Sequence, residues 1–308
     1  MFRILVIRLG SLGDVVHALP AVASLKHSFP RSHLSWIIKP HFAPLLQDNP
    51  YVDEVIPFQR TMPGIAAAWR RLRREHFNLA VDLQGLIQSS LIAAATRAEK
   101  IVGLDRSQAR EPLAAMVYST AVKTTAVHRV DRYLELAAAA GATNLLRAFP
   151  LPQGKPEGEL PEGDFVLACP LAGWASKQWP LDYYGELADG LKIPLVLNGS
   201  PEAAERLARV EGAHVHISSI AGLIHATRRA KAVVGVDSGP LHLAAALGKP
   251  GVAIYGPTDP ASHGPYGGSI RVLRSADAVT SYKRRDEEDP SMRAIQPGEV
   301  LEMLNALP

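Results

Sequence analysis

Residues 233–256 are the segment that most constrains how this chain can fold: VVGVDSGPLHLAAALGKPGVAIYG. One short apolar run ends at Asp237 and another begins at residue 252, and fully apolar runs are typical of parallel strands covered on both faces. Between them, Ser238 and Gly239 leave backbone N–H groups free, and Pro240 suits a first helical turn because it has no N–H. The segment predicts a strand–helix–strand unit whose helix directs its positive dipole end at the sheet edge, where a phosphate fits.

The same alternation of strand and helix runs through both halves of the 308-residue chain. In the first half we expect strands at residues 3–9, 34–39, 53–58, 79–83 and 100–104, and helices at 15–28, 42–48, 64–75, 86–97, 111–119 and 128–140. In the second half we expect strands at 165–169, 195–198, 214–217, 233–236, 252–255 and 270–273, and helices at 181–191, 202–210, 220–229, 240–247 and 297–307. This rhythm predicts doubly wound parallel sheets of the α/β class.

Residues 151–163, LPQGKPEGELPEG, separate the two halves and are rich in Pro, Gly and Glu, as linkers are. We therefore expect a Rossmann-like domain over 1–150, a linker over 151–163, a second Rossmann-like domain over 164–290, and a last helix within 291–308. Ligands of open α/β sheets bind outside the carboxyl ends of the strands. The expected active site is a cleft that receives those ends from both sheets.

Composition excludes several classes of protein. A hydrophobic content of 47% provides a core that is stable without covalent cross-links. The one cysteine, Cys169, excludes an internal disulfide, and we expect it to be buried and inert. No apolar segment has the length of a membrane span and the chain begins with strand-like residues, so we expect a cytoplasmic protein. The net charge of +3 does not indicate nucleic acid as a partner.

Residues 66–75, AAAWRRLRRE, place four arginines on one predicted helix beside Trp69: Arg70, Arg71, Arg73 and Arg74. Two interpretations stay open. The arginines form an ordinary solvated helix face, or they contact anionic lipid headgroups or a phosphorylated substrate. Near an anionic membrane each arginine contributes roughly 1 kcal/mol.

The first strand-to-helix turn reads LGSLGD over residues 9–14, with two glycines that allow a tight turn close to a ligand. The pattern is not GxGxxG and no acidic residue closes the second strand, so a nicotinamide site is poorly supported. Asp14 begins the following helix. It is either a carboxylate stabilised by the helix dipole, contributing about 0.3–1 kcal/mol, or a general base facing the site.

The second half offers its own candidates. Lys177 lies in a loop after the first strand of that half and can neutralise a pyrophosphate, although a surface lysine is the plainer interpretation. Glu202, with Glu205 as a competitor, begins a helix from which a carboxylate can accept from ribose hydroxyls. His242 is more simply explained as a structural hydrogen-bonding residue. There is no Walker A loop, no GxSxG elbow and no metal-binding spacing among the histidines, so we expect no metal site.

Five motifs taken together, SLGDVVHALPAV, DLQGLIQS, KQWP, DSGPLHLAAALGKP and YGPTDP, resemble glycosyltransferase family 9, the ADP-heptose transferases of lipopolysaccharide core assembly. Residues 103–114 are similar to the heptosyltransferase I subgroup. The resemblance implies a GT-B fold, an inverting mechanism, ADP-heptose as donor and a Kdo–lipid A type acceptor at the inner face of the cytoplasmic membrane, to which the enzyme binds peripherally. It implies no required cofactor, leaves room for stimulation by Mg²⁺, and suggests that the last helix packs back on the first domain.

The resemblance also assigns roles, with Asp14 as catalytic base and Lys177 as the pyrophosphate-binding lysine. The other donor-binding candidates are Ser11, Gly13, Ser176, Glu202, Asp237, Ser238, Gly239 and His242, and the acceptor-binding candidates are Arg60, Gln84, Arg106 and Arg110. Three alternatives stay open: a heptosyltransferase with another acceptor such as a heptose, a sugar-nucleotide epimerase on the same scaffold, and a nucleotide-binding module without turnover.

Overall fold

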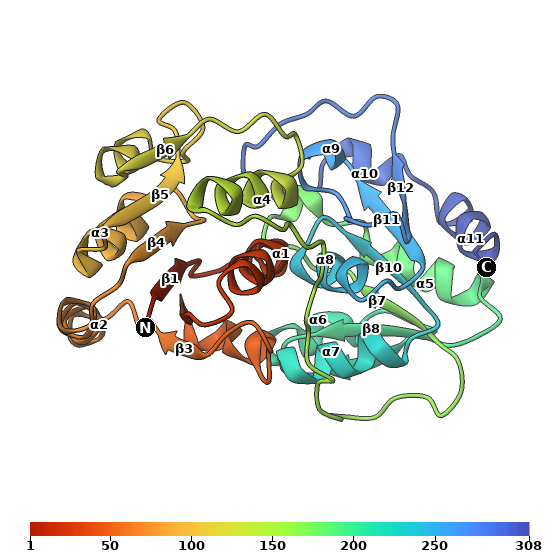
Figure 1. Ribbon diagram of the computed structural model, residues 1–308. Helices are drawn as coiled ribbons and strands as arrows, with labels where there is room; N and C mark the ends of the chain where they lie inside the picture. Colours follow the sequence, from red (N-terminus) through yellow and green to blue (C-terminus); the bar gives the residue numbers. More distant parts are fainter. Residues whose placement is uncertain (308) are drawn as a thin grey trace. The chain divides into compact units, whose positions relative to one another are not determined.

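Strands and helices alternate along the chain as the apolar runs predict, and the computed structural model describes residues 1–307 (Figure 1). Contacts divide the chain into two units: the first is Met1–Pro152, and the second begins at Gln153. Each unit contains one six-stranded sheet in which every neighbouring pair is parallel. The α/β class predicted from the sequence is therefore confirmed.

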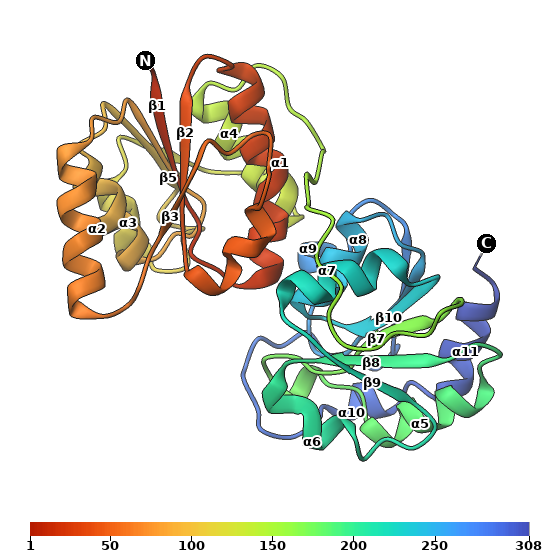
Figure 2. The same ribbon diagram turned by 90° about the horizontal axis from the view of Figure 1, so that it is seen from below.

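The first unit contains the elements β1 (Arg3–Ile7), α1 (Leu12–Ser28), β2 (His33–Ile38), η1 (Pro40–Leu46), β3 (Glu54–Pro57), α2 (Met62–Arg74), β4 (Leu79–Asp82), α3 (Ile87–Thr96), β5 (Lys100–Leu104), η2 (Pro112–Val117), β6 (Thr120–Val122) and α4 (Arg129–Ala140). Its strand order is β3-β2-β1-β4-β5-β6. Helices α1 and α4 pack together on one face of the sheet, and α2 and α3 pack together on the other (Figure 2).

Strand β1 shows why this sheet forms. Its residues Ile4, Leu5, Val6 and Ile7 are all fully buried, because helices cover both faces and every side chain of a central strand meets apolar neighbours. Successive side chains of a strand point to opposite faces, so the two helical layers share the strand. Leu5 and Ile7 belong to the core that includes residues of α2 and α3.

The second unit contains the elements β7 (Val166–Cys169), η3 (Ala175–Lys177), α5 (Leu181–Gly190), β8 (Leu195–Gly199), η4 (Pro201–Ala203), α6 (Ala204–Leu207), β9 (His214–Ile217), α7 (Ile220–Arg229), β10 (Ala232–Val236), α8 (Gly239–Ala246), β11 (Gly251–Tyr255), α9 (Pro260–His263), β12 (Ile270–Arg274), α10 (Pro290–Arg293) and α11 (Pro297–Asn305). Its strand order is β12-β11-β10-β7-β8-β9. Counted from the first strand of each unit, this is the same order as in the first unit.

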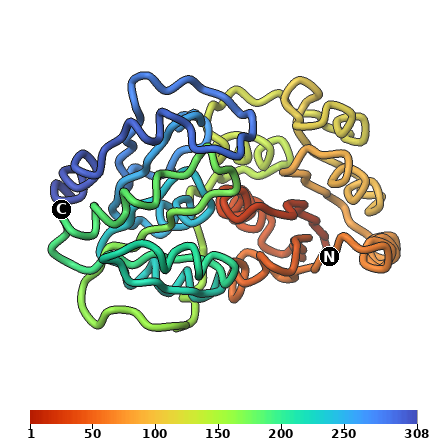
Figure 3. The backbone as a smooth tube through the Cα atoms, turned by 180° about the vertical axis from the view of Figure 1, so that it is seen from behind, coloured from red at the N-terminus to blue at the C-terminus, as the bar shows by residue number. Residues whose placement is uncertain are grey.

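The last helix, α11, packs against α5 (Figure 3). Val300 and Leu304 of α11 lie in one apolar cluster with Leu187 of α5, and the buried Trp179 indole donates a 2.9 Å hydrogen bond to the carbonyl of Ile295. The last helix therefore belongs to the second unit. Its apolar face is covered by α5, and packing of the last helix on the first domain stays a prediction.

Other local differences have physical causes. The helices expected at 42–48 and 111–119 are the short 3₁₀ segments η1 and η2, and the helix expected at 202–210 divides into η4 and α6. Each of these 3₁₀ segments has a proline in its first turn, and 3₁₀ geometry suits such short pieces. Strand β6 was not predicted, because three residues are too few to show an alternation.

Candidate functional site

Both units place predicted site residues at equivalent positions of their sheets. The strand order reverses between β1 and β4 in the first sheet and between β7 and β10 in the second, and each of these pairs is hydrogen-bonded. Ligands of open α/β sheets bind at such reversals, outside the carboxyl ends of the strands. Ser11, Gly13 and Asp14 follow β1, Gln84 follows β4, Ser176 and Lys177 follow β7, and Asp237, Ser238, Gly239 and His242 follow β10.

Asp14 is the third residue of α1 and is held from two sides. The backbone N–H and the hydroxyl of Ser11 donate to Asp14 Oδ2 at 3.2 and 3.0 Å, which satisfies a free donor at the helix start. The guanidinium of Arg8 forms an ion pair with the same oxygen. About a quarter of the Asp14 side chain, 27%, remains exposed, so a substrate hydroxyl can approach the carboxylate.

Positive charge around Asp14 determines its protonation state. Burial alone would raise the pKa of Asp14, but the charges of Arg8 and Arg129 outweigh burial and hold this pKa well below the usual range. Arg8 is itself buried, donates to the carbonyl of Leu83 at 3.0 Å and lies over the ring of Tyr133. Sequence reasoning missed Arg8 and Arg129. The sequence did contain a clue to Arg8, because this charged residue comes directly after an apolar strand and before the glycine turn.

The turn after β4 is fixed by a buried carboxyl group. Asp82 accepts hydrogen bonds from the Tyr118 hydroxyl at 2.7 Å and from the Gln84 backbone N–H at 2.8 Å, and burial raises the pKa of Asp82. The Gln84 side chain in turn accepts from the backbone N–H of Leu9 at 2.9 Å. Gln84 therefore bridges the ends of β1 and β4, next to the turn that carries Asp14.

Gly10 allows that turn to approach its neighbour closely. Its φ is +142°, and a Cβ built on it would lie 2.3 Å from a ring carbon of Phe42. Only glycine adopts this conformation without strain and leaves space for the ring.

The second unit holds a cation against a carboxylate at its strand reversal. Lys177 Nζ lies 2.6 Å from Asp237 Oδ2, and His242 Nε2 lies 3.4 Å from Asp237 Oδ1. Burial would raise the pKa of Asp237, but its contacts with His242 and Lys177 outweigh burial and keep this pKa well below the usual range. Three predicted donor-binding residues therefore form one charged cluster.

Three buried hydroxyl groups follow neighbouring strands of the same sheet. The hydroxyls of Ser176, Ser238 and Thr258 are buried and have no hydrogen-bond partner within residues 1–307. They follow β7, β10 and β11, which are adjacent in the sheet. Buried polar groups normally have a partner, so an external acceptor such as a phosphate oxygen would satisfy them. Sequence reasoning gave Thr258 no role, although it lies in the YGPTDP motif.

Trp174 brings two cations to the same loop. Lys177 Nζ lies 4.5 Å and the Arg284 guanidinium carbon 5.4 Å from the centroid of the Trp174 ring. Cations are attracted to the face of an indole ring, so Trp174 orients Lys177 before any ligand binds. Sequence reasoning gave neither Trp174 nor Arg284 a role.

The remaining candidates lie on flanking strands. Glu202 is exposed in η4, directly after β8, whereas its competitor Glu205 forms an exposed ion pair with Arg209 at 2.8 Å. The acceptor candidates Arg60, Arg106 and Arg110 are exposed in loops after β3 and β5 rather than at the strand reversal.

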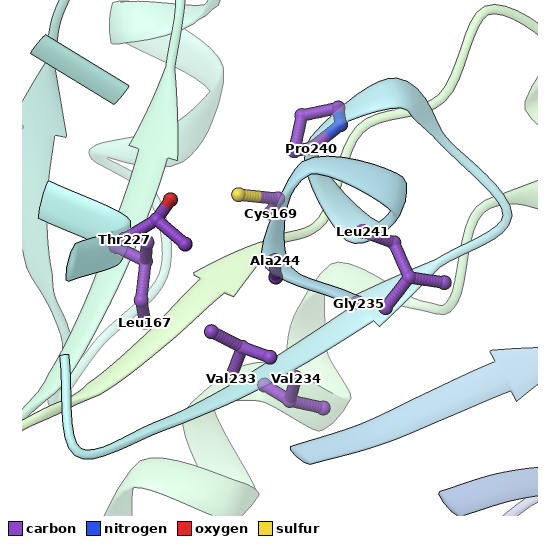
Figure 4. A pocket seen from close by; sticks show the side chains of 9 residues that line it. All are labelled: Leu167, Cys169, Thr227, Val233, Val234, Gly235, Pro240, Leu241 and Ala244. Carbon is purple, nitrogen blue, oxygen red and sulfur yellow. The ribbon is translucent and has the colours of Figure 1, made fainter. Parts of the chain in front are cut away.

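A cavity between α8 and the strands β7 and β10 differs from the charged cluster in having an uncharged lining (Figure 4). It is lined by Leu167, Cys169, Thr227, Val233, Val234, Gly235, Pro240, Leu241 and Ala244. No charged side chain lines it, so a diphosphate would find no counter-charge there. Cys169 is buried as expected, and burial raises the pKa of its thiol to about 12, which keeps it neutral.

Residues 1–307 contain neither a metal-binding group nor a membrane-spanning helix. They contain no group of three or more His, Cys, Asp or Glu side chains arranged to hold a metal ion. No helix in this part of the chain combines the length and the hydropathy needed to cross a membrane.

Comparison with known proteins identifies the family. The model of glycosyltransferase family 9 (heptosyltransferase) matches residues 65–292, most of the chain. The chain belongs to glycosyltransferase family 9. Among curated proteins, this family 9 enzyme is similar to lipopolysaccharide heptosyltransferase 1 of Pseudomonas aeruginosa, with 32% identity over 297 residues, covering 87% of this chain and 82% of the relative.

Solved structures agree with this assignment. The Escherichia coli heptosyltransferase WaaC with ADP superimposes with a TM-score of 0.79 at 25% identity and covers 99% of both chains. The same enzyme with ADP-2-deoxy-2-fluoro heptose superimposes with a TM-score of 0.77 at 26% identity over 99% of both chains. The family 9 enzyme described here therefore has the GT-B fold that the motifs implied.

Proposed function

We propose that this enzyme is an inverting heptosyltransferase that moves L-glycero-D-manno-heptose from ADP-heptose to a Kdo–lipid A type acceptor in lipopolysaccharide inner-core synthesis. The observation that carries the proposal is the complementary chemistry at the two strand reversals. The first unit holds an ionised, accessible carboxylate at Asp14, and the second holds Lys177 among buried hydroxyls that lack partners. The solved relatives hold ADP and an ADP-heptose analogue, and the curated relative is a lipopolysaccharide heptosyltransferase, which supports these donor and acceptor classes.

In the second unit, Lys177 and the hydroxyls of Ser176 and Ser238 bind the diphosphate of the donor. The hydroxyls gain the acceptors that they lack, and Lys177 shares its charge between Asp237 and the phosphates. As the glycosidic bond to phosphate breaks, negative charge develops on the departing ADP. Donors that are already in place stabilise this charge without reorganisation, which is the largest contribution in many enzymes. This arrangement needs no cofactor, and we expect Mg²⁺ at most to stimulate transfer.

In the first unit, Asp14 accepts the proton of the acceptor hydroxyl while the hydroxyl oxygen attacks the anomeric carbon and ADP leaves from the opposite side. The low pKa of Asp14 keeps it ionised at neutral pH but makes it a weak base. Proton transfer is therefore concerted with attack, because the hydroxyl becomes acidic only as its oxygen bonds to carbon. General base catalysis contributes roughly 10²–10⁴ in rate.

Acceptor recognition is assigned to Gln84 and to the exposed Arg60, Arg106 and Arg110. A guanidinium matches phosphate or carboxylate through two parallel hydrogen bonds, and an acceptor of this type carries both groups. Because that acceptor is a lipid, we place the enzyme in the cytoplasm, peripherally associated with the anionic inner face of the membrane.

The test of the base is Asp14→Asn, which keeps the shape of the side chain and removes its charge. We expect transfer to be lost while the affinity for ADP stays within a few-fold. Asp48→Asn is the matched control, because Asp48 is exposed and its φ of 53° suits asparagine. Turnover retained by Asp14→Asn would remove Asp14 from the base role.

One assay separates the proposal from its rivals. ADP-heptose is incubated with and without a Kdo-bearing lipid A, and ADP release and product mass are followed. The proposal requires ADP release and a heptose-extended lipid only when the acceptor is present. An epimerase would act on the donor alone, and an enzyme with another acceptor would extend a heptosylated lipid instead.

A further inference from the structure

Three neighbouring elements of the first unit expose an unusual amount of apolar surface. Helix α2 packs on α3, and α3 packs on η2; α2 and α3 lie side by side in Figure 1 and Figure 2. Fifteen large apolar residues are exposed among residues 1–307, and seven of them lie on these elements, with exposed fractions from 39% to 81%. These seven residues, called the apolar face below, are Met62, Ile65, Trp69, Ile87, Leu91, Leu113 and Met116.

The charge on the three elements themselves has one sign, while the carboxylate of Glu111, just before η2, accepts a 2.6 Å hydrogen bond from the backbone N–H of Ile87. The three elements contain four arginines, all on α2, and no Asp or Glu. Arg71 is paired with Glu54 and with Glu75, but Arg70, Arg73 and Arg74 have no carboxylate within ion-pair distance in the described chain. Arg73 lies 5.7 Å from the Trp69 ring centroid, so a cation borders the apolar side chains directly.

The first unit as a whole also carries a positive net charge. Residues 1–152 contain 18 Lys or Arg and 11 Asp or Glu, whereas residues 153–308 contain 15 and 19. The net charges are therefore +7 and −4, and the overall value of +3 conceals a strongly basic half. A basic patch attracts an anionic surface. The arginines beside the apolar face are positively charged, so anionic phospholipid headgroups can neutralise them.

We propose that the apolar face, with Arg70, Arg73 and Arg74, docks this enzyme on an anionic lipid bilayer. The apolar side chains enter the interface between headgroups and acyl chains, and the arginines pair with lipid phosphates above it. Large exposed apolar patches mark interaction surfaces, and an apolar strip bordered by arginines fits the boundary between hydrocarbon and charged headgroups.

The position of this face suits a lipid-borne acceptor. Helices α2 and α3 begin after the loops at the carboxyl ends of β3 and β4, the edge of the sheet that carries Asp14 and Gln84. Met62 and Ile87 are the first residues of the two helices. An acceptor can therefore leave its acyl chains in the bilayer while its sugar reaches the edge of the sheet. This step rests on the proposed function, whereas docking itself does not.

A second copy of the chain fits this surface poorly. In a two-fold dimer the same patch meets itself, so Arg70, Arg73 and Arg74 would face their own counterparts without an acidic residue from these three elements to separate them. A bilayer of anionic lipid supplies the missing negative charge. The same residues thus disfavour self-association and favour lipid.

The test measures binding to vesicles of phosphatidylcholine alone and of phosphatidylcholine with phosphatidylglycerol. We expect the unmodified enzyme to bind only the anionic vesicles. Reversal of Arg70, Arg73 and Arg74 to Glu should weaken this binding at least tenfold, since each arginine contributes roughly fivefold. Arg31→Glu, Lys192→Glu and Arg271→Glu together change the net charge equally at exposed positions elsewhere and should preserve most of the binding.

A second pair of variants tests the apolar component. Met62→Gln with Met116→Gln removes two side chains that are 81% and 80% exposed, and Val279→Gln is a control at 79% exposure. We expect the methionine variant alone to weaken vesicle binding. All variants should transfer heptose normally to an acceptor without acyl chains, which shows that they are folded.

The outcomes separate docking from catalysis. Unchanged binding of the arginine variant, or an equal loss in the charge control, would overturn the proposal. A dimer in solution that the methionine variant converts to a monomer would also overturn it and make this face a contact between copies. Vesicle binding without any heptose transfer would leave docking in place and remove the proposed function instead.

Discussion

At the scale of single residues, the molecule keeps two carboxylates ionised by placing a cation on each: Arg8 on Asp14 and Lys177 on Asp237. A buried ion pair costs desolvation, and losing one partner leaves the other charge uncompensated. Both pairs lie at strand reversals, where open α/β sheets bind ligands, so we infer that their charges prepare the proposed sites at some expense to stability.

The Arg8–Asp14 pair predicts a pH-dependent stability. The pKa of Asp14 is lower in the folded chain than in the unfolded one, so its contribution is present at neutral pH and is lost as the pH falls through the acid range. Asp14→Asn should lower the free energy of unfolding at pH 7 by about 2 kcal/mol. The difference from the parent should begin to shrink below about pH 4, where Asp14 takes up a proton in the unfolded chain while the folded chain still holds it ionised.

Urea unfolding of the parent and of Asp14→Asn at pH 7 and in acid measures this difference. Asp48→Asn serves again as the control, and it should change stability little at either pH. An Asp14→Asn penalty of the same size in acid and at neutral pH would mean that the ion pair is not its source.

Lys177→Ala should act mainly on the donor. The substitution removes a charge-assisted contact to the diphosphate, for which about 1.5–3 kcal/mol is typical, so the ADP-heptose KM should rise by roughly 10- to 100-fold. Initial rates against donor concentration measure the effect, with the exposed Lys192→Ala as control. An unchanged donor KM would count against the assignment.

The residues that sequence reasoning found and missed differ in kind. Asp14, Lys177 and Asp237 became candidates because they follow apolar strands or belong to recognisable turns. Arg129 and Arg284 were missed because their roles depend on neighbours more than one hundred residues away. Their sequence neighbourhoods alone suggest only surface arginines.

At the scale of elements, apolar runs predicted eleven of the twelve strands in residues 1–307, whereas short segments between them were harder to predict. Central strands such as β1 and β10 are buried on both faces and are therefore apolar throughout, which is a strong signal. The three residues of β6 and the 3₁₀ segments that begin with proline show no such continuous apolar run. The partner of α11 depends on which apolar faces remain uncovered, which only the assembled fold decides.

The packing of α11 leads to a prediction for this element. Leu304→Ala should open a void beside α5. Because Leu304 is 8% exposed, we expect the free energy of unfolding to fall by about 2 kcal/mol, near the lower end of the range for such substitutions. Hydrogen exchange should show the loss in β8 and β10 but not in β1. Val279→Ala, at an exposed site, should change neither. Faster exchange in the first unit would show that α11 also supports that unit.

At the scale of the whole molecule, the chain consists of two units with the same strand order but opposite net charge. The basic unit carries the proposed base, acceptor-binding and lipid-binding residues, and the acidic unit carries the proposed donor-binding residues. The bulk charge and the two-part organisation followed from the sequence. The charge separation became informative only when the structure showed which arginines remain without a partner.

The shared strand order has a consequence for evolution. Because each sheet builds its own core and its own ligand edge, either half can be inherited, exchanged or diversified while the other is preserved. A chimaera that joined residues 153–308 to the acceptor half of a related transferase would keep its sugar nucleotide and acquire a new lipid. New glycan structures could then arise by recombining existing halves, without reinventing the chemistry of transfer.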